Sequence, residues 1–337
     1  MQLTVKQIES ITKGAVSVTE EAEGILFHRF TEEQEKLFQE ERPWHYYNTK
    51  SPAGVKLQFT TDSEKLFVKL KTEKGDSRHF FSLEVFVDGK EIGCIQNYDE
   101  KILMDDYVHE QFSDGEYQKE FFLGNGDKTV CVYLPWSLNF YLKEFSLEEG
   151  ATFSPIKTAR KLLVFGDSIT QGYDALKSHH RYAARLSEAL SAEEINKAIG
   201  GENFFPKLAE ISDDIKPDYV TVAYGTNDWC IRERCAFEKN CKDFYEILSA
   251  KYPDAKIFAI SPIWRINHDE DQKMGPFTLI EETIRKVVEP LQNVIFIRGF
   301  ELVPGDVKYF ADGRVHPNDE GFDYYFKNLY EEIKKYL

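Results

Sequence analysis

Residues 161–172 read KLLVFGDSITQG, and this stretch decides the fold of the second half of the chain. The apolar run 162–165 is typical of a strand buried on both faces, as in a parallel sheet. The small residues around Ser168 let the backbone turn sharply after this strand. Ser168 therefore lies beyond the carboxyl end of a strand, where open α/β sheets bind their ligands. An ordinary turn in which Ser168 only caps a helix would also fit, so other motifs must decide.

The pattern around this stretch is an alternation of apolar strands with amphipathic helices. We expect strands at 162–165, 219–223, 257–260 and 294–297, and helices near 182–190, 244–248, 279–288 and 320–337. Because strands alternate with helices, residues 156–337 are predicted to form a three-layer α/β domain with a parallel sheet.

The first half of the chain has a different pattern. Short segments alternate apolar and polar residues, with turn signals such as Asp88-Gly89 between them, at 55–60, 65–71, 81–87, 129–134 and 140–147. This pattern predicts an antiparallel β-sandwich or jelly roll over residues 1–155. The sequence Thr31-Glu32-Glu33-Gln34 has the form of a capping box and predicts one early helix.

Composition excludes several classes of protein. The 337 residues fit two domains, and a net charge of −16 argues against a nucleic-acid partner. No apolar run is long enough to span a membrane, and Met1–Glu20 lacks the apolar core of a signal peptide, so we expect a cytoplasmic protein without membrane contacts. Five scattered cysteines indicate reduced thiols, and their spacing does not suggest a metal site.

Three further motifs follow predicted strands or precede the last helix. They are IGGEN at 199–203, YGTNDW at 224–229 and DGRVHPN at 312–318. Each motif alone would fit a plain turn or a solvated loop. Because loops at one edge of a sheet often build a site together, we expect the three motifs to gather near Ser168.

Together the four motifs resemble the SGNH hydrolase superfamily, the GDSL esterases and lipases. Ser168, Gly201, Asn227 and His316 occupy the positions of the four residues that name that superfamily. The resemblance implies a flavodoxin-like α/β fold and an esterase without a cofactor. The α/β-hydrolase fold is disfavoured, because its nucleophile elbow has a glycine two residues after the serine, where this chain has Thr170.

The resemblance also implies a role for each of these residues. Ser168 would be the nucleophile and His316 the general base. The oxyanion hole would consist of the Ser168 N–H, the Gly201 N–H and the Asn227 side-chain amide. Gly200 is an alternative to Gly201 that the sequence leaves open.

The aspartate of the last motif departs from the family pattern. The family places its aspartate three residues before the histidine, but that position is Gly313 here and the acid, Asp312, lies four residues before. Asp312 would complete a triad if the loop bulges by one residue. Otherwise a backbone carbonyl would orient His316, and the site would be a Ser-His dyad.

The substrate is inferred from the domain arrangement. A β-sandwich ahead of an SGNH domain resembles the arrangement in microbial carbohydrate esterases that remove acetyl groups. By this resemblance we expect a serine esterase that hydrolyses short O-acyl esters, above all O-acetyl groups on oligosaccharides, through an acyl-serine intermediate. Trp229 and Trp264 are candidates to line a sugar site, and Asp228 and Arg265 to hydrogen-bond it. Core or lid packing is the alternative for the two tryptophans.

Two other functions are considered. A GDSL lipase or thioesterase would use the same motifs on longer acyl chains, and a non-catalytic carbohydrate-binding protein could share the fold. The sequence also leaves open whether the chain forms a homo-oligomer.

Overall fold

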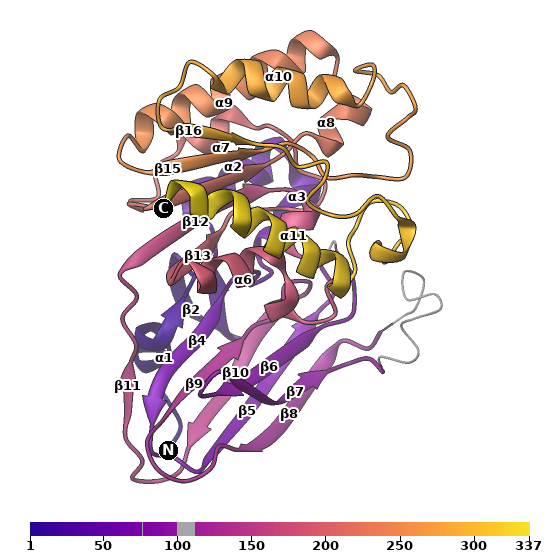
Figure 1. Cartoon of the computed structure of the whole chain (residues 1–337). Coiled ribbons are helices and arrows are strands. Elements are labelled where there is room, and N and C mark those ends of the chain that lie inside the picture. Colours follow the sequence, from indigo (N-terminus) through magenta and orange to yellow (C-terminus); the bar gives the residue numbers. More distant parts are fainter. Residues whose placement is uncertain (76, 100–111) are drawn as a thin grey trace. The chain divides into compact units, whose positions relative to one another are not determined.

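The computed structural model describes residues 1–75, 77–99 and 112–337. It consists of two compact units (Figure 1). The first contains Met1–Thr158 and Leu176–His179, and the second contains Ala159–Ala175 and His180–Leu337. The boundary between the two units therefore lies at 158/159, three residues after the 155/156 boundary expected from the sequence. The short segment Leu176–His179 also belongs to the first unit.

The first unit contains two antiparallel sheets, which are visible in Figure 1. In one sheet the order is β1 (Thr12–Lys13), β4 (Lys56–Thr61), β9 (Lys128–Tyr133), β6 (Ser82–Val87) and β7 (Lys90–Gln96), with β11 (Phe153–Pro155) paired to β4. In the other sheet the order is β2 (Ser17–Glu21), β3 (Gly24–His28), β10 (Asn139–Leu147), β5 (Lys65–Glu73) and β8 (Gly115–Phe122).

The apolar faces of these two sheets pack against each other. Leu57 and Val132 of one sheet share a buried core with Val68 of the other. Phe59 of β4 meets Phe145 of β10 edge to face, with ring centroids 5.8 Å apart. The predicted antiparallel β-sandwich is confirmed.

Two local sequence signals in this unit are confirmed as well. Helix α2 (Glu32–Glu41) begins with the predicted capping box, in which the Thr31 hydroxyl accepts from the Gln34 N–H and the Gln34 side chain accepts from the Thr31 N–H. Asp88 and Gly89, with φ of 49° and 78°, form the turn between β6 and β7. The helices α1 (Val5–Ile11) and α3 (Pro43–Thr49) were not expected from the sequence.

The second unit is built on a five-stranded parallel sheet. Its strands are β12 (Arg160–Gly166), β13 (Ala192–Asn196), β14 (Tyr219–Ala223), β15 (Lys256–Ile260) and β16 (Val294–Ile297), in the spatial order β13-β12-β14-β15-β16. This is the flavodoxin-like order 2-1-3-4-5, whose switch point lies between the first and third strands. Ligands of such sheets bind beyond the carboxyl ends of these two strands, here β12 and β14.

Helices cover both faces of this sheet. They are α5 (Ser168–Gln171), α6 (Tyr182–Ala189), α7 (Pro206–Glu210), α8 (Thr226–Ile231), α9 (Arg234–Lys251), α10 (Thr278–Val288) and α11 (Asp319–Ile333). Val164 of β12 shares a core with Leu186 of α6 and Phe322 of α11. On the opposite face, the Phe165 ring packs on Phe244 of α9 at 5.4 Å. Figure 1 shows α9 and α11 on opposite sides of the strands, which confirms the predicted three layers.

Helix α9 is much longer than the segment 244–248 that its apolar residues indicated. None of the helices in the described part of the chain is both long and apolar enough to cross a bilayer. All five cysteines are free thiols.

Candidate active site

Ser168 lies directly beyond β12, at the first position of the short helix α5. The preceding Asp167 caps this helix, because its Oδ1 accepts a hydrogen bond of 3.0 Å from the Ile169 N–H. A Cβ atom on Gly166 would lie 2.2 Å from Thr170 Oγ1, so only glycine allows this close turn. Ser168 is thus held at the switch point of the sheet, with 7% of its surface exposed.

His316 is fixed just ahead of α11. Asn318 caps that helix by accepting a 2.9 Å hydrogen bond from the Gly321 N–H. The His316 carbonyl accepts from the Ala311 N–H at 2.9 Å, which closes the loop before the helix. In this position His316 Nε2 lies 2.8 Å from Ser168 Oγ, although the two residues are 148 positions apart.

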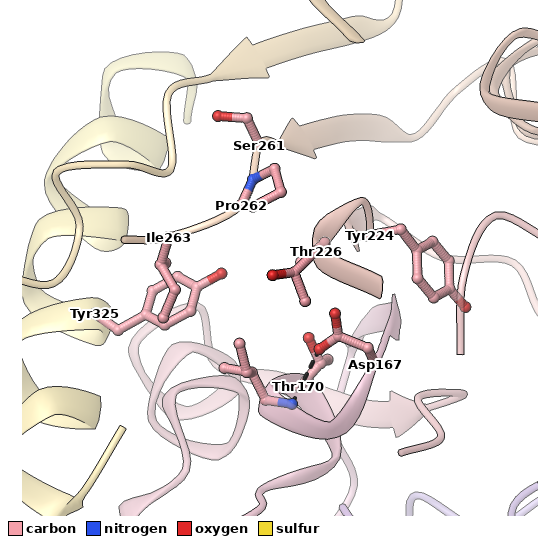
Figure 2. Close-up of a pocket in the computed structure, with 10 residues that line it drawn as sticks. Asp167, Thr170, Tyr224, Thr226, Ser261, Pro262, Ile263 and Tyr325 are labelled. Atoms are coloured by element: carbon pink, nitrogen blue, oxygen red, sulfur yellow. Dashed lines mark hydrogen bonds between the residues drawn. The ribbon is translucent and has the colours of Figure 1, made fainter. Parts of the chain in front are cut away.

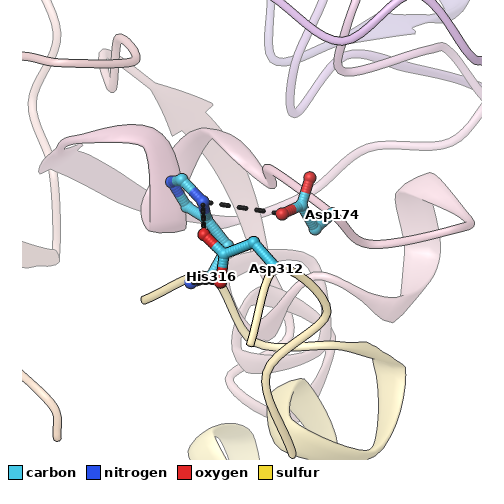
Figure 3. Close-up of side chains that lie close together, drawn as sticks. All are labelled: Asp174, Asp312 and His316. Carbon is cyan, nitrogen blue, oxygen red and sulfur yellow. Dashed lines mark hydrogen bonds and ion pairs between the residues drawn. The ribbon is translucent and has the colours of Figure 1, made fainter. Parts of the chain in front are cut away.

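Asp312 contacts the other nitrogen of the imidazole (Figure 3), since its Oδ2 lies 2.8 Å from His316 Nδ1. Its Oδ1 accepts from the backbone N–H groups of Arg314, Val315 and His316 at 2.9, 2.8 and 3.1 Å. Gly313 adopts φ of 61°, a conformation that favours glycine. The loop therefore accommodates the extra residue and still brings the carboxylate to the ring.

The ionisation state of Asp312 determines which nitrogen of His316 carries the proton. Partial burial would raise the pKa of Asp312, but the hydrogen bond from His316, the charge of its imidazolium form and the backbone N–H groups hold that pKa well below its usual range. The ionised carboxylate only accepts hydrogen bonds. His316 Nδ1 must therefore carry a proton toward Asp312, which leaves Nε2 to accept from the Ser168 hydroxyl.

The two glycines after β13, Gly200 and Gly201, differ in the hydrogen bonding of their N–H groups. The Gly200 N–H donates to Gln171 Oε1 at 2.8 Å and is therefore already engaged. Gly201 occupies the third position of a turn closed by a 3.0 Å hydrogen bond from the Glu202 N–H to the Ile199 carbonyl, and its φ is 79°. Of the two glycines, Gly201 is the one that fits an oxyanion donor.

Asn227 connects this turn to the end of β14. Its Nδ2 donates to the Glu202 carbonyl at 2.9 Å. The amide has two hydrogens, and this bond uses one of them. Asn227 is thus anchored to the turn that contains Gly201, as an oxyanion donor requires.

Trp229 and Arg265 do not lie where the sequence analysis expected them. Trp229 has no exposed surface, and its Nε1–H donates to the Gly275 carbonyl at 2.7 Å. The Arg265 guanidinium lies 5.1 Å above the Trp229 ring and donates to the Thr226 carbonyl at 3.3 Å. Because both side chains pack in the interior, the expected contact with sugar does not fit their positions.

Asp228 is also an interior residue, with no exposed surface. Its Oδ2 accepts a 3.4 Å hydrogen bond from the Phe204 N–H. Burial raises the pKa of Asp228 to about 7, although this hydrogen bond and the charge of Arg232 oppose the shift. The expected role in substrate binding does not fit this environment, in which Asp228 connects the short helix α8 to the backbone at Phe204.

Replacing Asp228 with asparagine is expected to stabilise the protein more at high pH than at low pH. Between the ordinary aspartate pKa and about pH 7, the unfolded chain loses the proton while the folded protein keeps it, so the wild type loses stability as pH rises. The asparagine side chain does not titrate, so the variant has no such loss. Denaturant unfolding should show a benefit about 2 kcal/mol larger at pH 8.5 than at pH 5.5. The exposed control Asp254→Asn should show no difference, and an equal benefit at both pH values would contradict the buried-carboxyl account.

Trp264 is the one predicted aromatic residue that remains partly exposed. Its ring packs on Phe310 at 5.0 Å, two residues before Asp312. The neighbouring Ile266 N–H donates to the Arg314 carbonyl at 3.0 Å, which connects this loop to the loop that holds His316. Trp264 therefore keeps its place as a candidate for substrate contact.

A small pocket lies beside Asp167 (Figure 2). Tyr325 and Ile263 line it together with Thr226. Its volume of about 10 Å³ is room for a single water molecule at most. Burial raises the pKa of Asp167 to about 7. This pocket is too small for an acyl chain or a sugar.

Two residues next to His316 were not expected from the sequence. The Tyr173 ring lies 5.4 Å from the imidazole ring, and Asp174 Oδ2 lies 3.5 Å from His316 Nδ1 (Figure 3). Both follow the first motif within a few residues of Ser168, but an acid in a loop carries no signal of its own. Ligand atoms of Asp174, Asp312 and His316 lie within 4.8 Å of one another, yet both imidazole nitrogens already have partners, so this set does not fit a metal.

Comparison with known families identifies the same part of the chain. Residues 164–324 match the GDSL-like Lipase/Acylhydrolase family. A GDSL esterase/lipase of Arabidopsis thaliana is 29% identical over 124 residues, which are 31% of this chain and 50% of that protein. The chain thus matches half the length of this curated relative. The predicted resemblance to the GDSL hydrolases is confirmed, and the match supports an ester hydrolase.

Solved structures resemble nearly the whole chain. The salicylyl-acyltransferase SsfX3 from a tetracycline biosynthetic pathway is 22% identical, with a TM-score of 0.78 over 96% of this chain and 94% of that one. An acetyl xylan esterase from the rumen bacterium Butyrivibrio proteoclasticus is 16% identical, with a TM-score of 0.62 over 99% and 98% of the two chains. At these identities the likeness establishes the two-domain fold.

Proposed function

We propose that this chain, whose residues 164–324 have the pattern of the GDSL-like lipases and acylhydrolases, is a serine esterase that removes short acyl groups, above all O-acetyl groups of oligosaccharides. One observation carries the proposal. Ser168 Oγ, the His316 imidazole and the Asp312 carboxylate form a continuous chain of two 2.8 Å contacts at the switch point of the sheet. A serine hydroxyl is a weak nucleophile until such a base takes its proton.

In the first step, Ser168 Oγ forms a bond to the carbonyl carbon of the ester while His316 Nε2 takes the hydroxyl proton. The resulting imidazolium is stabilised by the negative charge of Asp312. The tetrahedral intermediate then breaks the bond to the sugar oxygen. His316 returns its proton to that oxygen, so the sugar leaves as an alcohol and the acyl group stays on Ser168.

In the second step, water takes the place of the sugar. His316 removes a proton from the water as its oxygen bonds to the acyl carbon. When the second intermediate collapses, the bond to Ser168 Oγ breaks and His316 protonates that oxygen. Acetic acid is released and the enzyme returns to its starting state.

Each intermediate has a negative oxygen that needs hydrogen-bond donors. We assign this role to the N–H groups of Ser168 and Gly201 and to the Asn227 amide. The assignment is supported by the engaged Gly200 N–H and by the anchoring of Asn227 to the turn that contains Gly201. Donors fixed before the reaction stabilise developing charge without reorganisation.

The choice of an acetylated carbohydrate rests on two supports. The fold is similar along its whole length to that of an acetyl xylan esterase. Trp264 offers a partly exposed aromatic face beside the His316 loop, and such faces suit sugar rings. The cytoplasmic location expected from the sequence stays a prediction, as does any homo-oligomer.

The experiment compares three substrates: acetylated xylo-oligosaccharides, p-nitrophenyl acetate and a p-nitrophenyl ester of a long fatty acid. Wild type and Ser168→Ala are assayed side by side. We expect Ser168-dependent acetate release from the oligosaccharides and little hydrolysis of the long-chain ester.

Other outcomes point to other functions. Preference for the long chain would indicate a lipase or thioesterase, and sugar binding without Ser168-dependent hydrolysis would indicate a carbohydrate-binding protein. Because the fold also resembles an acyltransferase, the assay includes an added alcohol as acceptor. If an ester of that alcohol is the main product, the enzyme is an acyltransferase rather than a hydrolase.

A further inference from the structure

Two carboxylates approach the same nitrogen of His316 (Figure 3). Asp312 Oδ2 lies 2.8 Å from Nδ1, and Asp174 Oδ2 lies 3.5 Å from it. Asp312 belongs to the histidine loop, whereas Asp174 follows the serine helix α5, so two distant segments supply the acids. The usual serine-histidine arrangement requires one acid, which leaves Asp174 without an assigned role.

We propose that Asp174 is a second positioning acid of the site, which shares with Asp312 the stabilisation of the imidazolium form of His316. The inference rests on the proposed esterase function and deepens it. Asp312 holds the Nδ1 proton by a short hydrogen bond. Asp174, at the longer distance, contributes its charge.

Both acids are close enough to His316 to respond to the charge of its ring. Their oxygens lie within 4.8 Å of each other and of the imidazole. Both carboxylates lie on the Nδ1 side of the ring. Proton uptake from Ser168 at Nε2 makes the whole ring positive, so the attraction between the ring and both carboxylates grows only as the reaction proceeds. Interactions that appear only in the transition state accelerate the chemical step.

The burial of Asp174 supports a fixed role rather than a solvated one. Its side chain has no exposed surface, and a buried carboxylate needs polar or charged partners. Its φ of 73° lies in the left-handed region, which aspartate and asparagine tolerate better than most residues. Asp174→Asn therefore removes the charge while keeping the backbone conformation, whereas alanine would not.

Other groups that face His316 also enter the pH dependence. They are Tyr173 from the same loop and Asp167 at the start of α5, in addition to Asp174 and Asp312. Arg265 acts on Asp167. All of these except the substituted carboxylate remain in place in Asp174→Asn.

The test is a double-mutant cycle of Asp174→Asn and Asp312→Asn, with kcat/KM for p-nitrophenyl acetate measured from pH 5 to pH 9. The rate of covalent labelling of Ser168 by a fluorophosphonate is measured in parallel, because labelling needs the same base but no natural ester. Asp214→Asn is the matched control, since Asp214 is exposed and also has a positive φ, of 53°.

We expect Asp174→Asn to lower kcat/KM by about 10-fold and Asp312→Asn by about 100-fold, because each acid partly replaces the other. The double variant should lose about 10⁴-fold, as expected when a histidine has no acid left. In Asp174→Asn the low-pH limb of the profile should move to lower pH, since protonation of the imidazole loses one favourable charge. The control should match the wild type.

Two results would overturn the inference: a double variant no slower than Asp312→Asn, or a loss in Asp174→Asn with an unmoved low-pH limb, which a merely structural role would give. Failure of the proposed function looks different. If no ester is hydrolysed but Ser168 is labelled, the labelling rates decide about Asp174. If Ser168 is neither active nor labelled, both proposals fall.

Discussion

Replacing Ser168 with alanine is expected to lower kcat/KM for p-nitrophenyl acetate by about 10⁴- to 10⁶-fold. The variant keeps the proposed oxyanion donors and the proposed base but has no atom to accept the acyl group, so only slow attack by water should remain. The measurement is a steady-state assay at constant enzyme purity, with product followed by absorbance.

The control for this variant is Ser212→Ala, which removes a hydroxyl outside the site from the same unit. Both variants should keep the circular dichroism spectrum and melting temperature of the wild type, because Ser168 is small and its loss leaves little empty volume. A Ser168→Ala variant that retains more than about a tenth of the activity would contradict the assignment of the nucleophile.

Replacing His316 with glutamine should cost about 10⁴-fold or more, since in serine hydrolases loss of the base is as damaging as loss of the nucleophile. Glutamine can hydrogen-bond Ser168 Oγ from a position similar to that of Nε2, but it cannot take up the proton. The loss should appear in kcat, with KM changing much less.

Serine and histidine act as a unit, so their effects should not add. The double variant Ser168→Ala/His316→Gln is expected to be no slower than Ser168→Ala alone. A double variant that is slower by the product of the two single losses would show that His316 acts on something other than the Ser168 hydroxyl.

The architecture could be predicted from local patterns. The apolar run 162–165 became β12, and the alternation after it became the flavodoxin-like sheet. The Thr31 capping box began a helix. These elements follow from periodicity and capping, which depend on neighbours in sequence. The length of α9 could not be predicted, because the first half of this helix, Arg234 to Lys242, contains mostly polar residues and shows no clear apolar period.

The proximity of Ser168 and His316 follows from the motifs, one of which comes directly after a strand while the other precedes the last helix. The contact of Asp312 with His316 could not be predicted from spacing alone, because it depends on the conformation of the loop. In that loop Gly313 adopts a positive φ and three backbone N–H groups donate to the carboxylate. No spacing rule in the sequence contains that geometry.

Side-chain direction in the segments after the strands was the least predictable feature. Trp229 and Asp228 follow Asn227 in the short helix α8, yet they turn into the core, while Asp174, in the loop after α5, turns toward His316. A segment of one or two turns is too short for its periodicity to separate an inner from an outer face, so adjacency to a candidate catalytic residue predicts little about contact with substrate.

The most direct test of the account is to treat the folded protein with a fluorophosphonate and map the adduct by mass spectrometry of its peptides. We predict one adduct per chain, on Ser168, absent in Ser168→Ala and formed much more slowly in His316→Gln. A folded wild-type protein that hydrolyses p-nitrophenyl acetate but carries its adduct elsewhere, or none at all, would contradict the claim that Ser168 is the nucleophile.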